Sequence, residues 1–517
     1  MTAEARTDVP ADLIGVPSLT LDEAQLGDLE LLLSGVFAPL SGFMCDADVT
    51  AVREQGTLAD GTPFPIPVTL DVSPDAVPSA AGQVLLADPE GTPLARLEIT
   101  GRSEVTAPHQ AAADGTRLVR LCGPVTVVRE PEHGPFRRLM RPPAEVRAEF
   151  GDTPVLAYAS HGPVHSRQIG QLRHMAGQLK ARLLLLPLIT GQAEVVTRPE
   201  ALIRAVLAAA ANLPPGTVVV PVPLARRDHG ASPASELAAQ ALVAAAYGAT
   251  HLMADVGAPE EDVAAPISVE RAGDWAYDPR AEVWRPLALI EAGTEQGDLS
   301  PGELGDLLDA GAEIPAWFTP PSVAQELRRA RPPRSERGFV LFLTGLSGSG
   351  KSTIARNLAD VLAERGDRKV TLLDGDLVRQ LLSAGLTFSR ADRNLNIARI
   401  GFVAAEIARH GGIAICAPIA PYAAARAQVR RMVSETGDFL LIYVATPVEV
   451  CEARDRKGLY AKARAGLIDH FTGVSDPYEE PLDADLVIDT STMTREQATE
   501  AVLGLLTSGG WLSPAEG

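Results

Sequence analysis

The feature that most constrains the fold of this chain is a glycine-rich loop that follows an apolar strand and opens a helix. The loop reads Gly345-Leu-Ser-Gly-Ser-Gly-Lys351-Ser352, and it lies between the apolar run Val340–Leu343 and the helical run Thr353–Arg365. This is the phosphate-binding loop pattern in the structural context that it requires. Glycines let backbone N–H groups turn toward phosphates, and the helix N-terminus adds the positive end of its dipole. The pattern therefore predicts a P-loop with an α/β domain around it.

Two side chains of the loop have predicted roles in phosphoryl transfer. Lys351 is expected to reach the β- and γ-phosphates of ATP, and the Ser352 hydroxyl is expected to bind Mg²⁺. The predicted ATP-binding residues are Gly345, Ser347, Gly348, Ser349, Gly350, Lys351, Ser352 and Thr353. We therefore expect ATP and Mg²⁺ as cofactors and Lys351 as a catalytic residue.

Two carboxylates follow the next predicted strand, at residues 369–373. Asp374 and Asp376 would lie beside the P-loop, where carboxylate oxygens can hold Mg²⁺ and position an attacking hydroxyl. The alternative is an Asx-rich turn that only closes the strand. We take both residues as catalytic candidates, with Ser352 and Asp374 as the predicted metal ligands.

A basic segment at residues 454–464 contains a glycine hinge at Gly458. Such a segment could close over phosphates and neutralise the charge that develops during transfer. The alternative is a solvated basic helix face. Because the segment stands downstream of a P-loop, we favour a lid, in which Lys457 would be catalytic.

Length, charge and cysteine content narrow the classes of protein. A chain of 517 residues needs about three or four domains. The formal net charge of −20 argues against a nucleic-acid partner, because phosphate backbones need basic faces. The N-terminus lacks a signal-peptide pattern, and no apolar run approaches the ~20 residues that cross a bilayer. The four cysteines are scattered, which argues against a disulfide framework or a zinc site and favours a cytoplasmic location.

The fold class predicted by the element pattern is α/β and multidomain. Residues 1–140 interrupt apolar runs of strand length with Pro, Gly and Asp, which predicts a β-rich domain. Residues 141–297 alternate strands with Ala-rich helices, which predicts an α/β domain with a parallel sheet. Residues 298–337 are expected to form a small helical module with a charged linker, and residues 338–517 the P-loop domain.

The C-terminal motifs resemble those of adenylyl-sulfate (APS) kinase along the whole domain. They read GLSGSGKST, LLDGDLVR, FSRADRNLNIARIGFVA, ICAPIAPY, ATPVEVCEARDRKGLYAKARAG and FTGVSDPYEEP. The resemblance implies transfer of the ATP γ-phosphoryl group to the ribose 3′-hydroxyl of APS, which gives 3′-phosphoadenylyl sulfate (PAPS). A different small-metabolite kinase with the same P-loop fold would not explain this combination of motifs.

The resemblance also implies how APS is held. Arg379, Arg393 and Asn396 would hold its sulfate and phosphate, and two phenylalanines would stack on its adenine. The complete set implied for APS is Asp376, Arg379, Phe388, Arg393, Asn396, Ile419, Ala420, Lys457 and Phe471. Many members of that family have a serine, once proposed as a phospho-acceptor, where this chain has Ala420. Since alanine cannot be phosphorylated, we expect direct transfer.

The preceding two-thirds of the chain resembles ATP sulfurylase (sulfate adenylyltransferase), whose N-terminal domain is PUA-like. The resemblance rests on residues 28–44, 58–72, 86–95 and 314–318. A sulfurylase followed by a kinase is the order of fused enzymes that activate sulfate. Both families commonly form homo-oligomers, so we expect a homo-oligomer with ATP and APS as its small-molecule partners.

The sulfurylase catalytic pattern is not intact. Active members carry Q-x-R-N-P-x-H-x-x-H, whereas residues 159–168 here read ASHGPVHSRQ. The family's G-R-D-H-A-G-P loop is replaced by DVGAP at 255–259, and the similar RRDHG at 226–230 matches a different, upstream segment. Because adenylyl transfer to sulfate needs cations, these losses predict an impaired site. The residues that would remain of it are His161, His165 and Arg167.

Three hypotheses follow for the whole chain. The first is an APS kinase whose sulfurylase-like region serves scaffolding, oligomerisation or nucleotide sensing. The second is a fully bifunctional enzyme with a rearranged sulfurylase site. The third is a nucleotide-binding regulator without catalysis, and the complete set of kinase residues argues against it.

Overall fold

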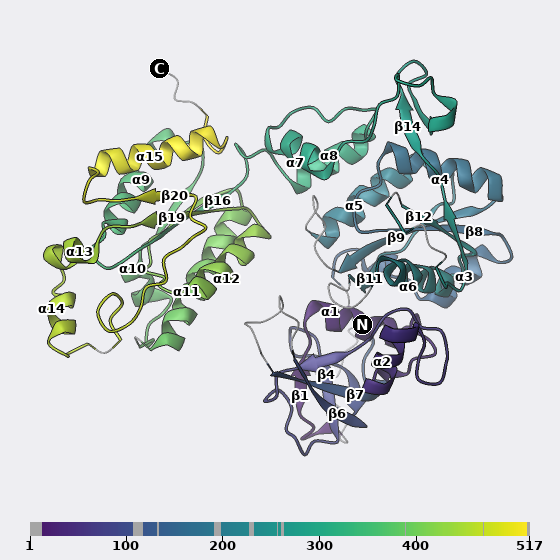
Figure 1. Ribbon diagram of the computed structural model, residues 1–517, viewed down its shortest axis with the longest axis horizontal. Helices are drawn as coiled ribbons and strands as arrows, with labels where there is room; N and C mark the ends of the chain where they lie inside the picture. The colour runs from purple at the N-terminus through teal and green to yellow at the C-terminus, as the bar shows by residue number, and fades with distance from the viewer. Residues whose placement is uncertain are drawn as a thin grey trace, which may run out of the picture. The chain divides into compact units, whose positions relative to one another are not determined.

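In the computed structural model the chain forms two compact units (Figure 1). Unit 1 comprises Met1–Leu304 and Ile314–Ala330, and unit 2 comprises Gly305–Glu313 and Arg331–Gly517. The structure describes residues 13–106, 117–131, 134–190, 198–226, 232–255, 257–259, 263–387, 389–468 and 470–513, and at 376 and 377 the backbone alone. None of the helices in these ranges combines the length and the apolar character that a membrane span requires.

The first part of unit 1 is a seven-stranded, mostly antiparallel sheet of order β1-β4-β5-β7-β2, in which β3 and β6 also pair with β7. The β-rich prediction for this region is confirmed. Its long central strand β7 carries antiparallel partners along its length. The elements are β1 (Ser18–Thr20), α1 (Glu23–Leu33), β2 (Gly42–Phe43), α2 (Asp46–Gln55), β3 (Leu70–Val72), β4 (Gln83–Ala87), β5 (Pro93–Glu98), β6 (Gly101–Thr106) and β7 (Arg117–Val127).

The second part of unit 1 is a six-stranded parallel sheet of order β10-β9-β8-β12-β13, with β11 also paired to β9. Helices alternate with these strands, as the sequence predicts. The elements are α3 (Pro143–Phe150), β8 (Val155–Ser160), α4 (Ser166–Leu179), β9 (Arg182–Thr190), α5 (Pro199–Ala210), β10 (Val218–Val219), β11 (Val222–Ala225), α6 (Pro233–Ala246), β12 (His251–Ala254), β13 (Ser268–Arg271), the hairpin β14 (Trp275–Asp278) and β15 (Val283–Pro286), and α8 (Pro321–Ala330). Short 3₁₀ turns lie at Arg137–Leu139 and Leu287–Leu289.

The two parts of unit 1 share one hydrophobic core. Helix α1 lies so close to β11 that a Cβ on Gly27 would stand 2.4 Å from the Pro223 carbonyl oxygen. Leu29 and Leu31 of α1 are buried in the same cluster as Leu224 of β11. Any residue other than glycine at position 27 would clash with this carbonyl, so Gly27 permits the close packing of α1 against β11.

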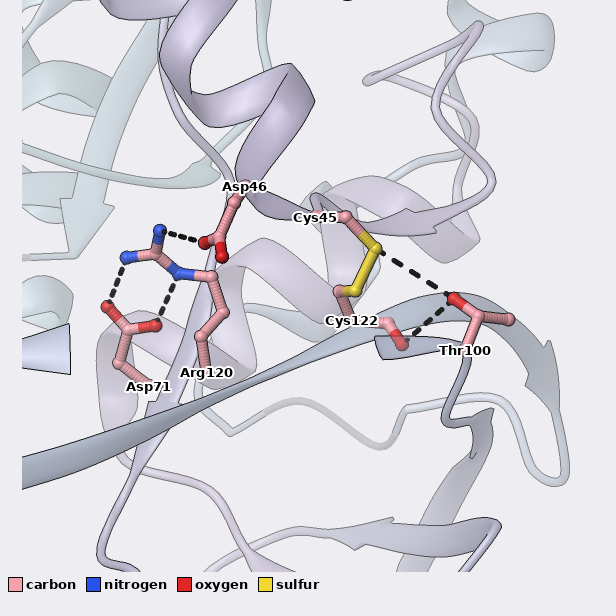
Figure 2. Close-up of a disulfide and its surroundings, with 6 residues drawn as sticks. All are labelled: Cys45, Asp46, Asp71, Thr100, Arg120 and Cys122. Atoms are coloured by element: carbon pink, nitrogen blue, oxygen red, sulfur yellow. Dashed lines mark hydrogen bonds and ion pairs between the residues drawn. A yellow bond between two sulfur atoms is a disulfide. The ribbon is translucent and has the colours of Figure 1, made fainter. Parts of the chain in front are cut away.

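Cys45 and Cys122 form a disulfide in unit 1, which corrects the expectation that the cysteines are unpaired (Figure 2). The two residues are 77 positions apart in sequence, yet their Cα atoms lie 5.1 Å apart. Strand β2 pairs with β7 at Gly123 and Pro124, and this pairing brings Cys45 beside Cys122. The sequence spacing of the cysteines did not predict this pair, because the pairing of β2 with β7 determines how close the two cysteines lie in space. Among the described residues no group of His, Cys, Asp and Glu could hold a metal ion.

An ion-pair network adjoins the disulfide on β7 (Figure 2). The buried Arg120 guanidinium donates to Asp71 at 2.8 Å and to Asp46 at 3.2 Å. The hydrogen bond from Arg120 to Asp71 is the main cause that raises the pKa of the guanidinium. The ion pairs therefore tie strand β3 and helix α2 to β7, and the disulfide adds a covalent link just before α2.

Unit 2 is a five-stranded parallel sheet of order β17-β18-β16-β19-β20 with helices on both faces. Figure 1 shows α9 and α15 on one face and α11 and α12 on the other, and each face has its own buried cluster. The predicted α/β P-loop domain is confirmed. The elements are β16 (Phe339–Thr344), α9 (Lys351–Arg365), β17 (Val370–Leu373), α10 (Gly375–Leu381), α11 (Arg390–Arg409), β18 (Ile413–Cys416), α12 (Ala423–Ser434), β19 (Asp438–Val444), α13 (Val448–Arg454), α14 (Leu459–Arg464), β20 (Leu486–Ile488) and α15 (Arg495–Ser508).

The C-terminal end of helix α7 (Pro301–Asp309) is part of unit 2, where its last residue, Asp309, forms ion pairs. Asp309 pairs with Arg331, with Arg337 and, at 3.2 Å, with Arg334. Arg337 also binds Asp438 at the start of β19, at 2.9 Å. The nearly buried Asp309 side chain therefore holds the charged segment 331–337 against the body of the unit.

Candidate active site at the P-loop

The P-loop lies between β16 and α9, at the edge where the parallel strands end. Its glycines Gly345, Gly348 and Gly350 all have positive φ, which turns the backbone sharply between strand and helix. Among the described residues, no group accepts a hydrogen bond from the backbone N–H of Gly350, Lys351 or Ser352. Free N–H groups at the start of a helix favour an anion. The loop thus has the geometry of a phosphate site.

Lys351 is folded into the loop. Its side chain is buried, and Nζ donates to the Leu346 carbonyl oxygen at 2.6 Å and to Ser349 Oγ at 3.3 Å. Burial lowers the pKa of the Lys351 ammonium to about 8, and the charge of Lys457 acts in the same direction. An arriving phosphate would replace the carbonyl oxygen as the partner of this ammonium.

Asp374 and Ser352 offer the oxygen atoms that Mg²⁺ prefers. Asp374 directly follows β17, and its nearly buried carboxylate accepts from Arg356 at 2.9 Å. Ser352 stands on the first turn of α9. Mg²⁺ beside phosphates commonly takes one or two protein oxygens and fills its other positions with phosphate and water. A hydroxyl and a carboxylate therefore fit this ion, whereas the side chain of Asp376 lies outside the described residues.

Helix α11 carries a group of buried polar atoms that lack partners. Asn396 is 6% exposed, and its Oδ1 has no hydrogen-bond partner among the described residues. The same holds for buried atoms of Arg393 and Asn394 on this helix, and of Ser383, which follows α10. Because buried polar groups are nearly always hydrogen-bonded, these atoms indicate a place for a polar ligand.

Arg393 is held by the segment that follows the basic lid candidate. Its guanidinium donates to Thr472 Oγ1 at 2.9 Å, to Asp476 at 3.0 Å and to the His470 carbonyl oxygen at 3.0 Å. Tyr422 also donates to Asp476, at 2.8 Å. Thr472 and Asp476 belong to the motif FTGVSDPYEEP, but their contact with Arg393 could not be predicted, because the motif does not show which residue the turn faces.

The remaining APS candidates stand in different settings. Phe471 is 9% exposed and packs edge-on against Tyr460, with ring centroids 5.0 Å apart. The charge of Arg379 on α10 is one of the causes that lower the pKa of Asp392, after hydrogen bonds from Thr387. Lys457 is exposed and precedes Gly458, whose φ of 65° separates α13 from α14. Phe388 lies outside the described residues.

The turn at Ile419 and Ala420 lies against the end of β16. Thr344 Oγ1 donates to the Ile419 carbonyl oxygen at 2.7 Å, and the Gly345 N–H reaches the same oxygen at 3.4 Å. Ala420 is buried with a φ of 45°, and its carbonyl oxygen accepts from Arg426 at 2.8 Å. The turn is therefore placed directly beside the P-loop.

In unit 1 two of the three candidates, His165 and Arg167, have protein partners. The His165 ring stacks on Phe318 at 4.3 Å, and its Nδ1 lies 3.0 Å from Thr319 Oγ1. Burial lowers the pKa of His165 to about 4. Arg167 pairs with Asp298 at 2.6 Å and with Asp255 at 3.4 Å.

His161 directly follows β8. Burial lowers the pKa of His161 to about 4, and the charge of Arg226, directly after β11, adds to the effect. Asp255 follows β12, as the sequence predicts, and accepts from Tyr158 at 2.7 Å. Two strand ends of this sheet thus carry the candidate residues together with an acidic group.

Family models match the chain in three consecutive stretches. A PUA-like domain covers residues 1–113, ATP-sulfurylase covers residues 137–330, and adenylylsulphate kinase covers residues 337–489. The last stretch contains the P-loop, Asp374 and the lid candidate.

Several known proteins are similar to this chain over nearly their full length. A sulfate adenylyltransferase from Phaeosphaeria nodorum is 36% identical, over 99% of this chain and 97% of that protein. The chain belongs to the family of fused ATP sulfurylases and APS kinases. A sulfate adenylyltransferase from Mycosarcoma maydis is also 36% identical, over 95% and 94%. The solved hexameric APS kinase from Thiobacillus denitrificans has a TM-score of 0.74 and 35% identity, over 97% of this chain and 95% of that one.

Membership of this fused family confirms both resemblances in the sequence and their order. The names of the relatives differ, because proteins that match nearly the whole chain are called sulfate adenylyltransferase in one case and APS kinase in the other. The comparisons give no support to an impaired sulfurylase region. They favour the bifunctional alternative.

Proposed function

We propose that unit 2 is an adenylyl-sulfate kinase, which transfers the γ-phosphoryl group of ATP to the 3′-hydroxyl of APS and yields ADP and PAPS. The observation that carries the proposal is the P-loop with free N–H groups and a buried Lys351 at its centre. The match of residues 337–489 to adenylylsulphate kinase supports the choice of APS as acceptor.

In this mechanism the loop N–H groups and Lys351 bind the phosphates, and Lys351 exchanges the Leu346 carbonyl oxygen for phosphate oxygen. Ser352 and Asp374 would hold Mg²⁺, which offsets the negative charge of the phosphates. Asp376 orients the 3′-hydroxyl and accepts its proton. Lys457 neutralises charge on the transferring group from the lid side. Transfer is direct, since position 420 offers no hydroxyl.

For APS itself we propose the residues that the family motifs assign. The unsatisfied atoms of Arg393 and Asn396 support a role for both in binding the sulfate and phosphate. The remaining proposed contacts are Arg379, Phe388, Ile419, Ala420, Lys457 and Phe471. Stacking by Phe471 would require it to turn from its present packing against Tyr460.

The test of the kinase follows ADP formation from ATP and APS with the purified full chain. Lys351→Ala should abolish turnover, because removing the ammonium removes the central phosphate contact. Lys369→Ala is the matched control, since Lys369 is an exposed lysine of the same domain. Turnover that persists in the Lys351 variant would exclude the P-loop as the site.

The second candidate activity is adenylyl transfer from ATP to sulfate in unit 1. Full-length similarity to proteins named sulfate adenylyltransferase supports it, and His161, His165 and Arg167 would then form a rearranged site. Pyrophosphate release from ATP and sulfate, with pyrophosphatase present, tests it. Pyrophosphate release that persists in the Lys351→Ala variant would support the hypothesis of a bifunctional enzyme. Absence of pyrophosphate release would show that unit 1 lacks this activity.

Assembly and boundaries complete the proposal. The relative from Thiobacillus denitrificans is hexameric, which supports a homo-oligomer here. Domain boundaries at residues 140, 297 and 337, and a place in the cytoplasm, stay predictions.

A further inference from the structure

Two threonines without an assigned role in the reaction hold one carbonyl group of the P-loop: Thr446, in the motif that begins ATPVEV, and Thr490, which lies beyond the quoted motifs. Thr446 Oγ1 lies 3.1 Å and Thr490 Oγ1 lies 2.9 Å from the Ser349 carbonyl oxygen. Ser349 and Thr446 are buried, so this carbonyl would lose its hydration without a compensating donor. A carbonyl oxygen has two lone pairs and accepts from both hydroxyls.

The sheet delivers both threonines to the same place. Val444 of β19 pairs with Ile488 of β20, and Thr446 and Thr490 each stand two residues beyond that pair. Strand β19 also pairs with β16, which leads into the P-loop. Because parallel strands end at a common edge, the two hydroxyls meet the loop from neighbouring strands.

The held carbonyl sets the direction of the next N–H group. In a planar trans peptide the C=O and N–H bonds point in opposite directions. With the Ser349 oxygen turned toward the threonines, the Gly350 N–H points away from them, where no described residue accepts it. A Cβ at position 350 would stand 3.1 Å from Thr490 Cγ2, at a φ of 103°, so the contact also requires glycine there.

Arg454 fixes the orientation of the Thr490 hydroxyl. Its guanidinium donates to Thr490 Oγ1 at 2.7 Å and to the Thr490 carbonyl oxygen at 2.9 Å. The arginine thereby uses one acceptor position of this hydroxyl, whose hydrogen faces the Ser349 carbonyl oxygen and Thr446 Oγ1, each 2.9 Å away. The chain Arg454, Thr490, Ser349 thus runs from the start of the lid candidate to the phosphate loop.

We infer that Thr446 and Thr490 form a clamp that presets the P-loop N–H groups for the phosphates of ATP. They are positioning residues, because they contact the P-loop, whereas the N–H groups of the loop would bind the phosphates. The inference rests on the proposed function for its kinetic consequence, whereas ATP binding by itself tests the clamp.

The experiment compares Thr446→Val and Thr490→Val, which remove a hydroxyl and keep the shape, with the corresponding serine variants. The full chain is titrated with a fluorescent ATP analogue without APS, and kcat and both KM values are then measured. We expect each valine variant to weaken ATP binding about fivefold, the effect of one hydrogen bond. The KM for APS should stay unchanged, and the serine variants should bind as the wild type.

The matched control is Thr492→Val, because Thr492 is exposed and donates only to the Asp489 carbonyl oxygen. Valine variants that bind ATP as the wild type does would overturn the clamp, as would serine variants as weak as the valine ones. Failure of the wild type to phosphorylate APS would refute the proposed function, while the ATP titrations would still decide the clamp.

Discussion

Removing the Cys45–Cys122 disulfide should destabilise unit 1 and leave the kinase reaction intact. The bond closes a loop of 77 positions, and the chain-entropy relation for a loop of this length gives about 4.5 kcal/mol. The double variant Cys45→Ser/Cys122→Ser should therefore lower the free energy of unfolding of unit 1 by about 4.5 kcal/mol. Urea denaturation followed by tryptophan fluorescence measures this loss. Three of the four tryptophans, Trp275, Trp284 and Trp317, belong to unit 1.

Reductant provides the matched comparison for this prediction. Dithiothreitol should destabilise the wild type to the level of the double variant and leave the variant unchanged. ADP formation from ATP and APS should be the same in both proteins, because the two cysteines lie outside unit 2. Thiol titration of the unfolded, unreduced chain should find two free thiols, those of Cys416 and Cys451. Four free thiols would show that the disulfide does not form. A wild type whose stability does not change with reductant would show that the disulfide does not stabilise unit 1.

Three other perturbations follow from buried charges. Because burial lowers the pKa of Lys351 to about 8, and ATP needs the charged ammonium, the KM for ATP should rise about tenfold per pH unit above pH 8; a KM that is flat to pH 9.5 would contradict this. Asp309→Asn should destabilise unit 2 by about 3 kcal/mol, since it leaves paired arginines without their carboxylate, whereas the exposed Asp306→Asn should be near neutral in the same thermal unfolding assay. The depressed pKa of His165, about 4 against 6.5 unfolded, favours the neutral form in the fold, so its contribution is present above pH 6.5 and is lost as pH falls toward 4, at about 1.4 kcal/mol per pH unit. His165→Gln should flatten that slope in acid denaturation, and an unchanged slope would speak against a buried neutral histidine.

Local patterns in the sequence predicted most of what positions the site. The P-loop and its flanking elements are contiguous, so glycine spacing and apolar runs suffice to place Lys351 at the start of α9. Asp374 could be placed for the same reason, because it directly follows an apolar strand.

Contacts between distant segments could not be predicted in this way. The disulfide depends on the pairing of β2 with β7, and the hold of Asp476 on Arg393 joins residues 83 positions apart. Thr446 and Thr490 follow two different strands, and only the register of β19 against β20 shows that both reach Ser349. The aromatic packing of Phe471 was likewise hidden, because a phenylalanine in a polar turn gives no sign of its partner.

Direct transfer of the γ-phosphoryl group from ATP to APS at this P-loop is best tested by following the phosphoryl group itself. The full chain is incubated with Mg²⁺, APS and ATP labelled at the γ-phosphate, and the products are separated. We expect label on the 3′-oxygen of PAPS, none on the protein, and no transfer by Lys351→Ala. Label that stays in ATP, or that appears on the protein before it reaches APS, would contradict direct transfer at this P-loop.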